Sequence, residues 1–295
     1  MLNDISSPNT NKAMPSMLAL LFAVTALLAM SASVKAQGTW AAGPDLNPPT
    51  GGTRLVGAYF PANGRFYAVG GRSADAAGNQ FTHPFEYDPG TNTWTTKAAT
   101  LPDADVSNMA CGVLTVGGTP QIYCVGGSTG GGTTATPRMF SFDPVADTIT
   151  ALTSADDWPG DLPSSGNILP GGFAVLNNKL YTIGAFQISP ATMLGDLWEF
   201  DPSQAVGSRW TLKAGMPVEH GYVPATVIGG MIYTAGGAII SGTTLDDSAD
   251  SYKYDPVANS WTQIADIPRA TGETRAVTLN GKMWVLGGGR TAPNP

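Results

Sequence analysis

The amino-acid sequence predicts an all-β fold made of tandem copies of one unit of about fifty residues. Three observations support this. A short apolar segment ending in two small residues recurs five times, an aromatic-x-aromatic-Asp-Pro motif follows it four times, and a tryptophan follows that motif in three of the four units. The composition agrees, because 37 glycines and 23 prolines among 295 residues supply many turns and a hydrophobic content of 42% supplies a core.

Each unit begins with two apolar segments that we expect to form strands a and b of a hairpin. The tight turns between them carry residues that tolerate positive φ, namely Asn63-Gly64, Asn177-Asn178, Gly229-Gly230 and Asn280-Gly281. Strand b ends in the glycine pair, and successive first glycines are 56, 58, 52 and 51 residues apart. The five segments are FYAVGG at 66–71, IYCVGG at 122–127, LYTIGA at 180–185, IYTAGG at 232–237 and MWVLGG at 283–288.

The second half of each unit predicts strands c and d. Strand c ends at the Asp-Pro pair, because proline cannot donate to a strand ladder and presets a turn. The four copies are FEYDP at 85–89, FSFDP at 140–144, WEFDP at 198–202 and YKYDP at 252–256. Strand d carries Trp94, Trp210 or Trp261, with Ile149 in the second unit. We interpret the repeated aspartates as turn residues.

These repeated motifs resemble those of the Kelch repeat, and the resemblance covers nearly all of residues 38–289. It implies a β-propeller whose four-stranded blades surround a central channel. The repeats fall roughly at 53–94, 108–149, 171–210, 224–261 and, in part, 274–295. In such a fold the glycines permit close approach of the next blade, and the repeated Tyr and Trp fill the wedge between blades.

The strand register predicts about five blades, of which the last is incomplete. Residues 38–45, with Trp40, have the pattern of a strand d that closes the ring. Together with four complete units and one a–b pair, this gives 19 strands where five closed blades need 20. We therefore expect a C-terminally truncated sequence.

The N-terminal segment predicts export. Residues 17–30 form an uncharged apolar run of 14, whereas a membrane-spanning helix needs about 20. Val34 and Ala36 are small residues at the positions that a signal peptidase reads, so we expect a signal peptide at 1–36 and cleavage before Gln37. An uncleaved anchor is the alternative. Residues 37–295 then form the propeller domain of a secreted, periplasmic or cell-surface protein that is not inserted in the membrane.

The charge balance argues against a nucleic-acid partner. The chain has 15 basic and 22 acidic residues, a net charge of −7, and only 13% of its residues are charged. Binding a phosphate backbone requires clustered Lys and Arg. A protein or glycan ligand is the expected partner.

Propeller geometry predicts where that ligand binds. The b–c connections are long, at 72–83, 128–138, 187–195 and 238–250, and they share one face with the d–a connections such as 161–170. We expect long loops on this face to form the binding surface around the channel mouth. The alternative is that glycine-rich stretches such as 128–134 are only spacers.

Five residues of this face are candidate ligand-binding residues: Glu219, His220, Arg269, Glu273 and Arg275. The arginines offer bidentate contacts to a carboxylate, and a glutamate is a possible acid or base. Some Kelch propellers are sialic-acid epimerases of the bacterial periplasm, so a sugar mutarotase is an alternative function. The structural alternative is that these charged side chains are solvated at the rim of the channel or form ion pairs with one another.

No assembled catalytic residues, metal site or cofactor site is predicted. Copper oxidases resembling galactose oxidase use two Tyr, two His and a Cys-modified Tyr. Here His83 and His220 are the only histidines, and Tyr222, two residues after His220, is accompanied by no His-His pair and no second nearby tyrosine. Aspartate groups such as 156, 157 and 161 lack the spacing of a calcium loop. The sequence therefore favours an exported, non-catalytic interaction module, with a carbohydrate-active enzyme as the alternative.

Cys111 and Cys124 lie on strands a and b of the second unit. A turn centred on 117/118 makes them direct cross-strand partners, whereas a four-residue loop places Cys124 opposite Val113. Export favours a disulfide between them, and two buried thiols are the alternative.

Overall fold

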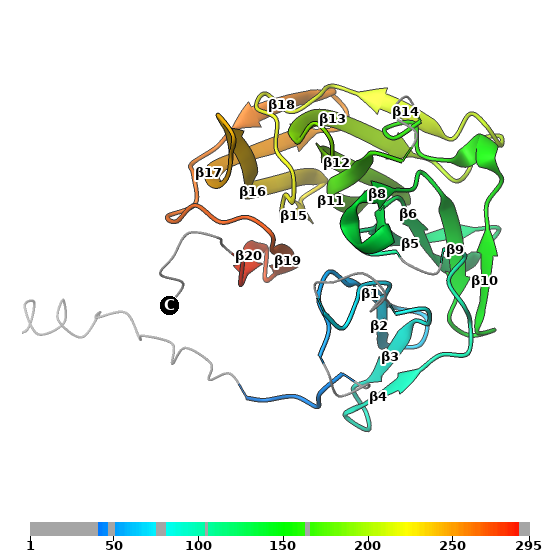
Figure 1. Cartoon of the computed structure of the whole chain (residues 1–295). Coiled ribbons are helices and arrows are strands. Elements are labelled where there is room, and N and C mark those ends of the chain that lie inside the picture. Colours follow the sequence, from blue (N-terminus) through cyan, green and yellow to red (C-terminus); the bar gives the residue numbers. More distant parts are fainter. Residues whose placement is uncertain (1–40, 47–50, 75–80, 104–105, 163–165, 289–295) are drawn as a thin grey trace, which may run out of the picture. The chain divides into compact units, whose positions relative to one another are not determined.

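The strands form four four-stranded antiparallel sheets, one two-stranded sheet and one short hairpin (Figure 1). The computed structural model describes residues 41–46, 51–74, 81–103, 106–162 and 166–288. All the strands belong to one compact unit that begins at Pro44. Within the described ranges the helical elements are two 3-10 turns, η1 (Gly130–Gly132) and η2 (Ser154–Asp156), and neither they nor any other helix there has the length and hydropathy to cross a membrane.

Each four-stranded sheet is one predicted repeat. The first contains β1 (Val56–Phe60), β2 (Arg65–Val69), β3 (Phe85–Asp88) and β4 (Thr93–Thr96). The second contains β5 (Ala110–Val116), β6 (Thr119–Val125), β9 (Met139–Asp143) and β10 (Thr148–Ala151), with the short pair β7 (Ser128–Thr129) and β8 (Thr134–Ala135) between them in sequence. The third contains β11 (Ile168–Leu176), β12 (Lys179–Gln187), β13 (Thr192–Phe200) and β14 (Trp210–Lys213). The fourth contains β15 (Ala225–Ile228), β16 (Met231–Ser241), β17 (Thr244–Asp255) and β18 (Ser260–Gln263), and β19 (Arg275–Leu279) pairs with β20 (Lys282–Leu286).

The sheets follow one another as the blades of a propeller. The first strand of each blade lies beside the first strand of the next, in the order β1, β5, β11, β15 and β19. Figure 1 shows the sheets succeeding one another around these inner strands. The Kelch-type propeller predicted from the repeats is therefore confirmed, with four complete blades and an a–b pair. The predicted signal peptide and residues 38–40 of the predicted closing strand lie outside the described residues, and residues 41–46 contain no strand.

The b–c connections of blades 3 and 4 are hairpins and not the loops that the sequence predicted. The β12–β13 ladder continues to Gln187 and Thr192, and the β16–β17 ladder continues to Ser241 and Thr244. Each ladder shifts register at its repeat glycine, Gly184 or Gly236. A left-handed glycine can form a bulge that bends a strand without ending it, and sequence alone does not distinguish a bulge from a chain exit.

Aromatic side chains fill the wedges between blades, as predicted. In three blades the strand-b tyrosine is buried and its ring faces the aromatic residue that precedes the Asp-Pro turn of the next blade. The pairs are Tyr67 with Phe142, Tyr123 with Phe200 and Tyr181 with Tyr254, at centroid distances of 5.7, 6.0 and 6.4 Å. Because a single sheet would leave these rings in water, the contact between blades stabilises the repeat.

One glycine shows how closely the blades approach. Gly184 has φ +59°, and a Cβ atom there would lie 2.1 Å from the carbonyl oxygen of His220, in the segment that leads to blade 4. The equivalent Gly287 of the last pair has φ +72°, and no atom of the described residues lies within 4 Å of such a Cβ. The tight contact therefore exists where a following blade is packed.

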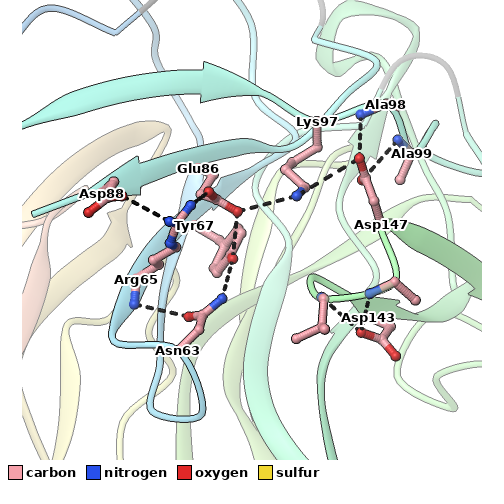
Figure 2. Close-up of polar contacts among 12 residues, drawn as sticks. Asn63, Arg65, Tyr67, Glu86, Asp88, Lys97, Ala98, Ala99, Asp143 and Asp147 are labelled. Atoms are coloured by element: carbon pink, nitrogen blue, oxygen red, sulfur yellow. Dashed lines mark hydrogen bonds and ion pairs between the residues drawn. The ribbon is translucent and has the colours of Figure 1, made fainter. Parts of the chain in front are cut away.

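A buried carboxylate of blade 1 links β2 and β3 to the residue that follows β4 (Figure 2). Glu86 on β3 accepts a 2.7 Å hydrogen bond from the hydroxyl of Tyr67, and it pairs with Arg65 and with Lys97, whose Nζ lies 3.3 Å away. Burial by itself raises the pKa of Glu86, but the hydrogen bonds from Tyr67, Arg65 and Lys97 outweigh it and lower the pKa. Blade 3 repeats the arrangement with Glu199, Tyr181, Lys179 and Lys213.

A disulfide joins β5 to β6. Cys111 and Cys124 are direct cross-strand partners, and the turn between these strands is Gly117-Gly118. This is the first of the two registers that the sequence allowed. Both cysteines are buried in the core between blades 1 and 2.

Candidate functional site

Four non-glycine residues in the left-handed conformation lie just before strand a of their blades. They are Arg54, Asn108, Tyr222 and Glu273, with φ of 60°, 57°, 48° and 52°. A non-glycine residue in this region costs about 1–3 kcal/mol, so such residues persist only where the surroundings hold them. Their recurrence at one repeat position indicates a shared structural cause.

For three of the four, Arg54, Asn108 and Tyr222, the preceding residue forms a backbone bridge. Thr53, Ser107 and Gly221 each pair with the residue that follows the glycine pair of the same blade. Each bridge consists of two N–H···O bonds of 2.7–3.0 Å, formed with Arg72, Ser128 and Ala238 respectively. The bridge holds the chain at the point where it turns into strand a.

The side chains of these four residues line one pocket of about 270 Å³. The pocket lies at the ends of the inner strands, on the side of the d–a connections where the sequence predicted the binding face. Four blades or partial blades contribute to it: Thr53, Arg54, Leu55, Asn108, Tyr222, Glu273, Thr274 and Arg275. We call it the central pocket.

Two arginines and a glutamate dominate the charge of the central pocket. The Cζ atom of Arg275 lies 5.3 Å from the ring centroid of Phe173, so its side chain reaches from β19 to β11. The surrounding protein atoms lower the pKa of Arg275 through desolvation. Arginine remains charged at any physiological pH and Arg275 is exposed, so its guanidinium is an accessible cation.

Neutral polar groups complete the central pocket. Asn108 is oriented by a 3.2 Å hydrogen bond from its Nδ2 to Ser128 Oγ. The ring of Tyr222 lies 5.6 Å from that of Phe186. The lining thus offers guanidinium and amide donors, a carboxylate and hydroxyl groups, which suit a polar or anionic ligand group.

The structure separates the five candidate residues that the sequence named. Glu273 and Arg275 share the central pocket. Glu219 lines a different groove, of about 310 Å³. Arg269 is exposed and lines neither site.

His220 is buried, and its contacts are those of a structural residue. Its Nδ1 lies 2.8 Å from the carbonyl oxygen of Val218, its Nε2 lies 3.5 Å from Asp250 Oδ2, and its ring faces Tyr252 edge-on. His83 contacts the carbonyl oxygen of Ala99 through Nδ1 at 2.9 Å. Among the residues that the structure describes, no three His, Cys, Asp or Glu side chains gather in a way that could hold a metal ion.

Sequence reasoning missed Arg54 and Asn108, although a signal for them existed. Aligning the segments before strand a brings one variable position into register, in GTRLV at 52–56, VSNMA at 106–110, SGNIL at 165–169, HGYVP at 220–224 and TGETR at 271–275. A repeat position that changes from unit to unit is a candidate for ligand contact. In blade 3 this position is Asn167, whose side chain instead bonds the backbone of Ser189.

Comparison with known proteins places these observations in a family context. No protein-family model matches the chain. Kelch-like protein terF of Aspergillus terreus is 25% identical over 235 residues, which are 77% of this chain and 48% of that protein. Kelch-like protein 23 of Pongo abelii is 25% identical over 219 residues, which are 72% of this chain and 36% of that protein. The chain thus spans less than half the length of these relatives.

A solved structure, described as the structure of YjhT, has a similar fold. The TM-score is 0.65 at 15% identity, and the similarity covers 82% of this chain and 78% of that one. At this identity the likeness concerns the fold. Together with the repeat marks, the four-stranded blades and the Kelch-like relatives, it shows that this chain is a Kelch-repeat β-propeller protein.

Proposed function

We propose that the protein is an exported interaction module that binds a protein or glycan ligand at the central pocket. The observation that carries the proposal is the convergence of four left-handed side chains, from four repeats, on one pocket. Backbone strain of this kind clusters at binding sites, because folding stability offsets its cost there. At Arg54, Tyr222 and Glu273, a scaffold without a ligand would carry glycine or asparagine, as at Asn108, at lower cost.

The pocket chemistry supports a ligand with an anionic or strongly polar group. Arg54 and Arg275 supply cationic donors, and Glu273 and Thr274 supply acceptors for hydroxyl or amide hydrogens. A volume of about 270 Å³ is near the lower end for ligand sites, about 300–1,000 Å³. Such a pocket suits one sugar ring or one side chain presented by a larger partner.

Binding can be tested on a glycan array and by calorimetry with the ligands that it identifies. We expect Arg275→Ala and Arg54→Ala to weaken binding by roughly tenfold or more, because a hydrogen bond to a charged group contributes about 1.5–3 kcal/mol. Arg269→Ala is the matched control, since this arginine lies outside the pocket, and it should bind as the wild type does. Equal affinity of all three variants would overturn the proposal.

Export is part of the proposal and has its own test. The apolar run at 17–30 and the small residues before Gln37 support it, and a disulfide is typical of oxidising compartments. N-terminal sequencing of the protein recovered outside the cytoplasm should begin at Gln37. A product that retains residues 1–36 would favour the uncleaved anchor.

A carbohydrate-active enzyme of the epimerase or mutarotase type is the second candidate. The observation in its favour is that Glu273 shares a pocket with two arginines, which could orient a carboxylated sugar while the glutamate transfers a proton. Mutarotation of sialic acid, followed by NMR, should then be lost in Glu273→Gln. If sialic acid equilibrated at the same rate with and without the wild-type protein, the enzyme would be excluded and the binding module would remain as the proposed function. No observation among the described residues favours the oxidase version.

A further inference from the structure

The hairpins that extend blades 3 and 4 enclose a second groove. It has a volume of about 310 Å³ and is lined by Thr192, Met193, Val218, Glu219, Ile239 and Ile240. The first two residues belong to β13 and the last two to β16, whereas Val218 and Glu219 belong to the connection between the blades. We call it the hairpin groove. It shares no lining residue with the central pocket.

The lining combines apolar walls with one charge. Met193, Val218, Ile239 and Ile240 supply the apolar surface, and Glu219 is the one ionisable residue among the six. A lysine or arginine side chain has the matching form, because its methylene stem packs on apolar surface while its charged head stays at a polar group. A purely apolar side chain would leave the carboxylate without a counter-ion.

A second acidic residue lies on the groove side of blade 4. Asp246 is the cross-strand partner of Ile239, so the two side chains share one face of the hairpin. Asp250 lies further along β17, past the register shift of the ladder, and its Oδ2 is 3.5 Å from Nε2 of His220, in the connection that leads from blade 3. Asp246 is exposed and the chain carries a net charge of −7, so the field at the groove favours a cationic partner.

The backbone of β16 offers a pairing edge beside this groove. Ala238 bonds Gly221 through both its N–H and its C=O on the edge away from β17. Alternate residues of a strand face the same edge, so the N–H and C=O of Ile240 face this edge too. Within the described part of the chain, no backbone hydrogen bond joins Ile240 to a residue outside its hairpin.

We propose that the hairpin groove binds an extended, basic peptide segment by strand addition. The segment pairs with the Ile240 edge and places one lysine or arginine in the groove, with the stem between Met193 and Ile239 and the charge at Glu219. Main-chain pairing supplies affinity and the cationic side chain supplies specificity, which is how sheet edges recognise peptides. The proposal is independent of the ligand of the central pocket.

Fluorescence polarisation with labelled pentapeptides tests the proposal on the full chain. The probe is acetyl-Thr-Val-Lys-Val-Thr-amide. One control replaces Lys with norleucine, which keeps the stem and removes the charge, and a second control carries an N-methyl group on the lysine amide, which blocks pairing. We expect both controls to bind at least tenfold more weakly, which corresponds to about 1.4 kcal/mol.

Protein variants test the same contacts from the other side. Glu219→Gln should lower affinity for the lysine peptide tenfold and leave the affinity for the norleucine peptide unchanged. Ile240→Pro removes the outward N–H, whereas Ile240→Val keeps it, so only the proline variant should lose binding. Thermal melting of each variant establishes that it is folded.

Four results would overturn the proposal. The first three are equal affinity for the lysine and norleucine peptides, unchanged binding of the N-methylated peptide, and loss of binding in Arg275→Ala, which would assign the peptide to the central pocket. Competition by spermine as strong as by the lysine peptide would likewise indicate a site for small cations and exclude strand addition.

Discussion

The indole Nε1 of Trp261 donates a 2.8 Å hydrogen bond to the carbonyl oxygen of Ala214, which belongs to the preceding blade. The N–H of Ala214 in turn donates to Asn259 Oδ1 at 2.9 Å, so side chains of blade 4 bind both backbone polar groups of this residue. Trp210 repeats the first contact, with Asp156 O of blade 2 at 2.8 Å. Among the described strands no ladder joins one blade to the next, so these bonds help to fix neighbouring blades against each other.

Trp261→Phe should destabilise the protein by about 1 kcal/mol, because it removes the donor to Ala214 and keeps most of the apolar contact. Urea denaturation measures the change. Trp210→Phe should behave in the same way, and the exposed Val257→Ala should change stability by less than about 0.5 kcal/mol. If Trp261→Phe left the free energy of unfolding unchanged, the hydrogen bond would contribute nothing to blade association.

Gly184→Ala should be severely destabilising, whereas Gly287→Ala should cost only about 1–2 kcal/mol. Both positions have positive φ, but a Cβ at Gly184 would lie 2.1 Å from a backbone oxygen and one at Gly287 has open space. The two substitutions therefore separate steric contact between blades from backbone strain. Soluble yield and melting temperature are the readouts, and equal losses would contradict the packing argument.

Stability should fall as the pH decreases from about 5 to 2, in part through Asp201. Partial burial acts to raise the pKa of Asp201, but hydrogen bonds from Ser203, Gln204 and Lys179 outweigh it and lower the pKa to about 2. The unfolded chain, with a pKa of about 3.9, binds more protons in this window, so the stabilisation is present above about pH 4 and is lost as the pH falls through the folded-state value.

Asp201→Asn tests this assignment, because its unfolding free energy should depend less steeply on pH between 2 and 4. Ser203→Ala removes the Oγ donor, at 2.6 Å, and keeps the backbone donor, at 2.9 Å, so its slope should be intermediate. If the unfolding free energies of Asp201→Asn and the wild type changed with pH at the same slope, other carboxylates would account for the acid sensitivity.

The unreduced, denatured protein should show no reactive thiol, since Cys111 and Cys124 form the disulfide and are the only cysteines in the sequence. Replacing both with alanine should cost about 3 kcal/mol, the value expected for a cross-link that closes a loop of about 15 residues. Thiol titration and urea denaturation measure the two effects. Two reactive thiols per chain would contradict the bridge.

Glu273→Gly should be more stable than Glu273→Gln by about 0.5–1 kcal/mol, because glycine adopts the observed φ of 52° without steric cost. Both variants should lose affinity for the ligand of the central pocket. A gain in stability with a loss of binding is the pattern expected where strain serves function. If Glu273→Gly were less stable than Glu273→Gln, Glu273 would have a structural role.

Much of the propeller could be predicted from the sequence because its determinants are local. The turn residues Asn177-Asn178 both have positive φ, and each strand c ends at the aspartate of its Asp-Pro pair or one residue before it. The tyrosines of strand b were expected between blades, and Tyr67 and Tyr181 are buried there. Each of these features depends on a few neighbouring residues that recur with every repeat.

The candidate site was only half predicted. Glu273 and Arg275 were named, but Arg54 is more than two hundred residues away in the chain, and only the curvature of the blades brings it to the same pocket. Glu219 and Glu273 were grouped because both precede a strand a, yet the hairpins of blades 3 and 4 place Glu219 in a separate groove. Loop length in sequence did not show that these connections continue as paired strands.

From its residues alone, this chain is recognisable as a series of blades, because periodic glycine, proline and aromatic positions dictate local backbone geometry and the burial of each strand. Which side chains meet at the channel mouth, and whether a glycine ends or bends a strand, was decided by tertiary packing. Those outcomes depend on contacts between residues far apart in the chain. The bridge between Ser107 and Ser128 within blade 2 and the approach of His220 to Gly184 hold conformations that no local preference favours.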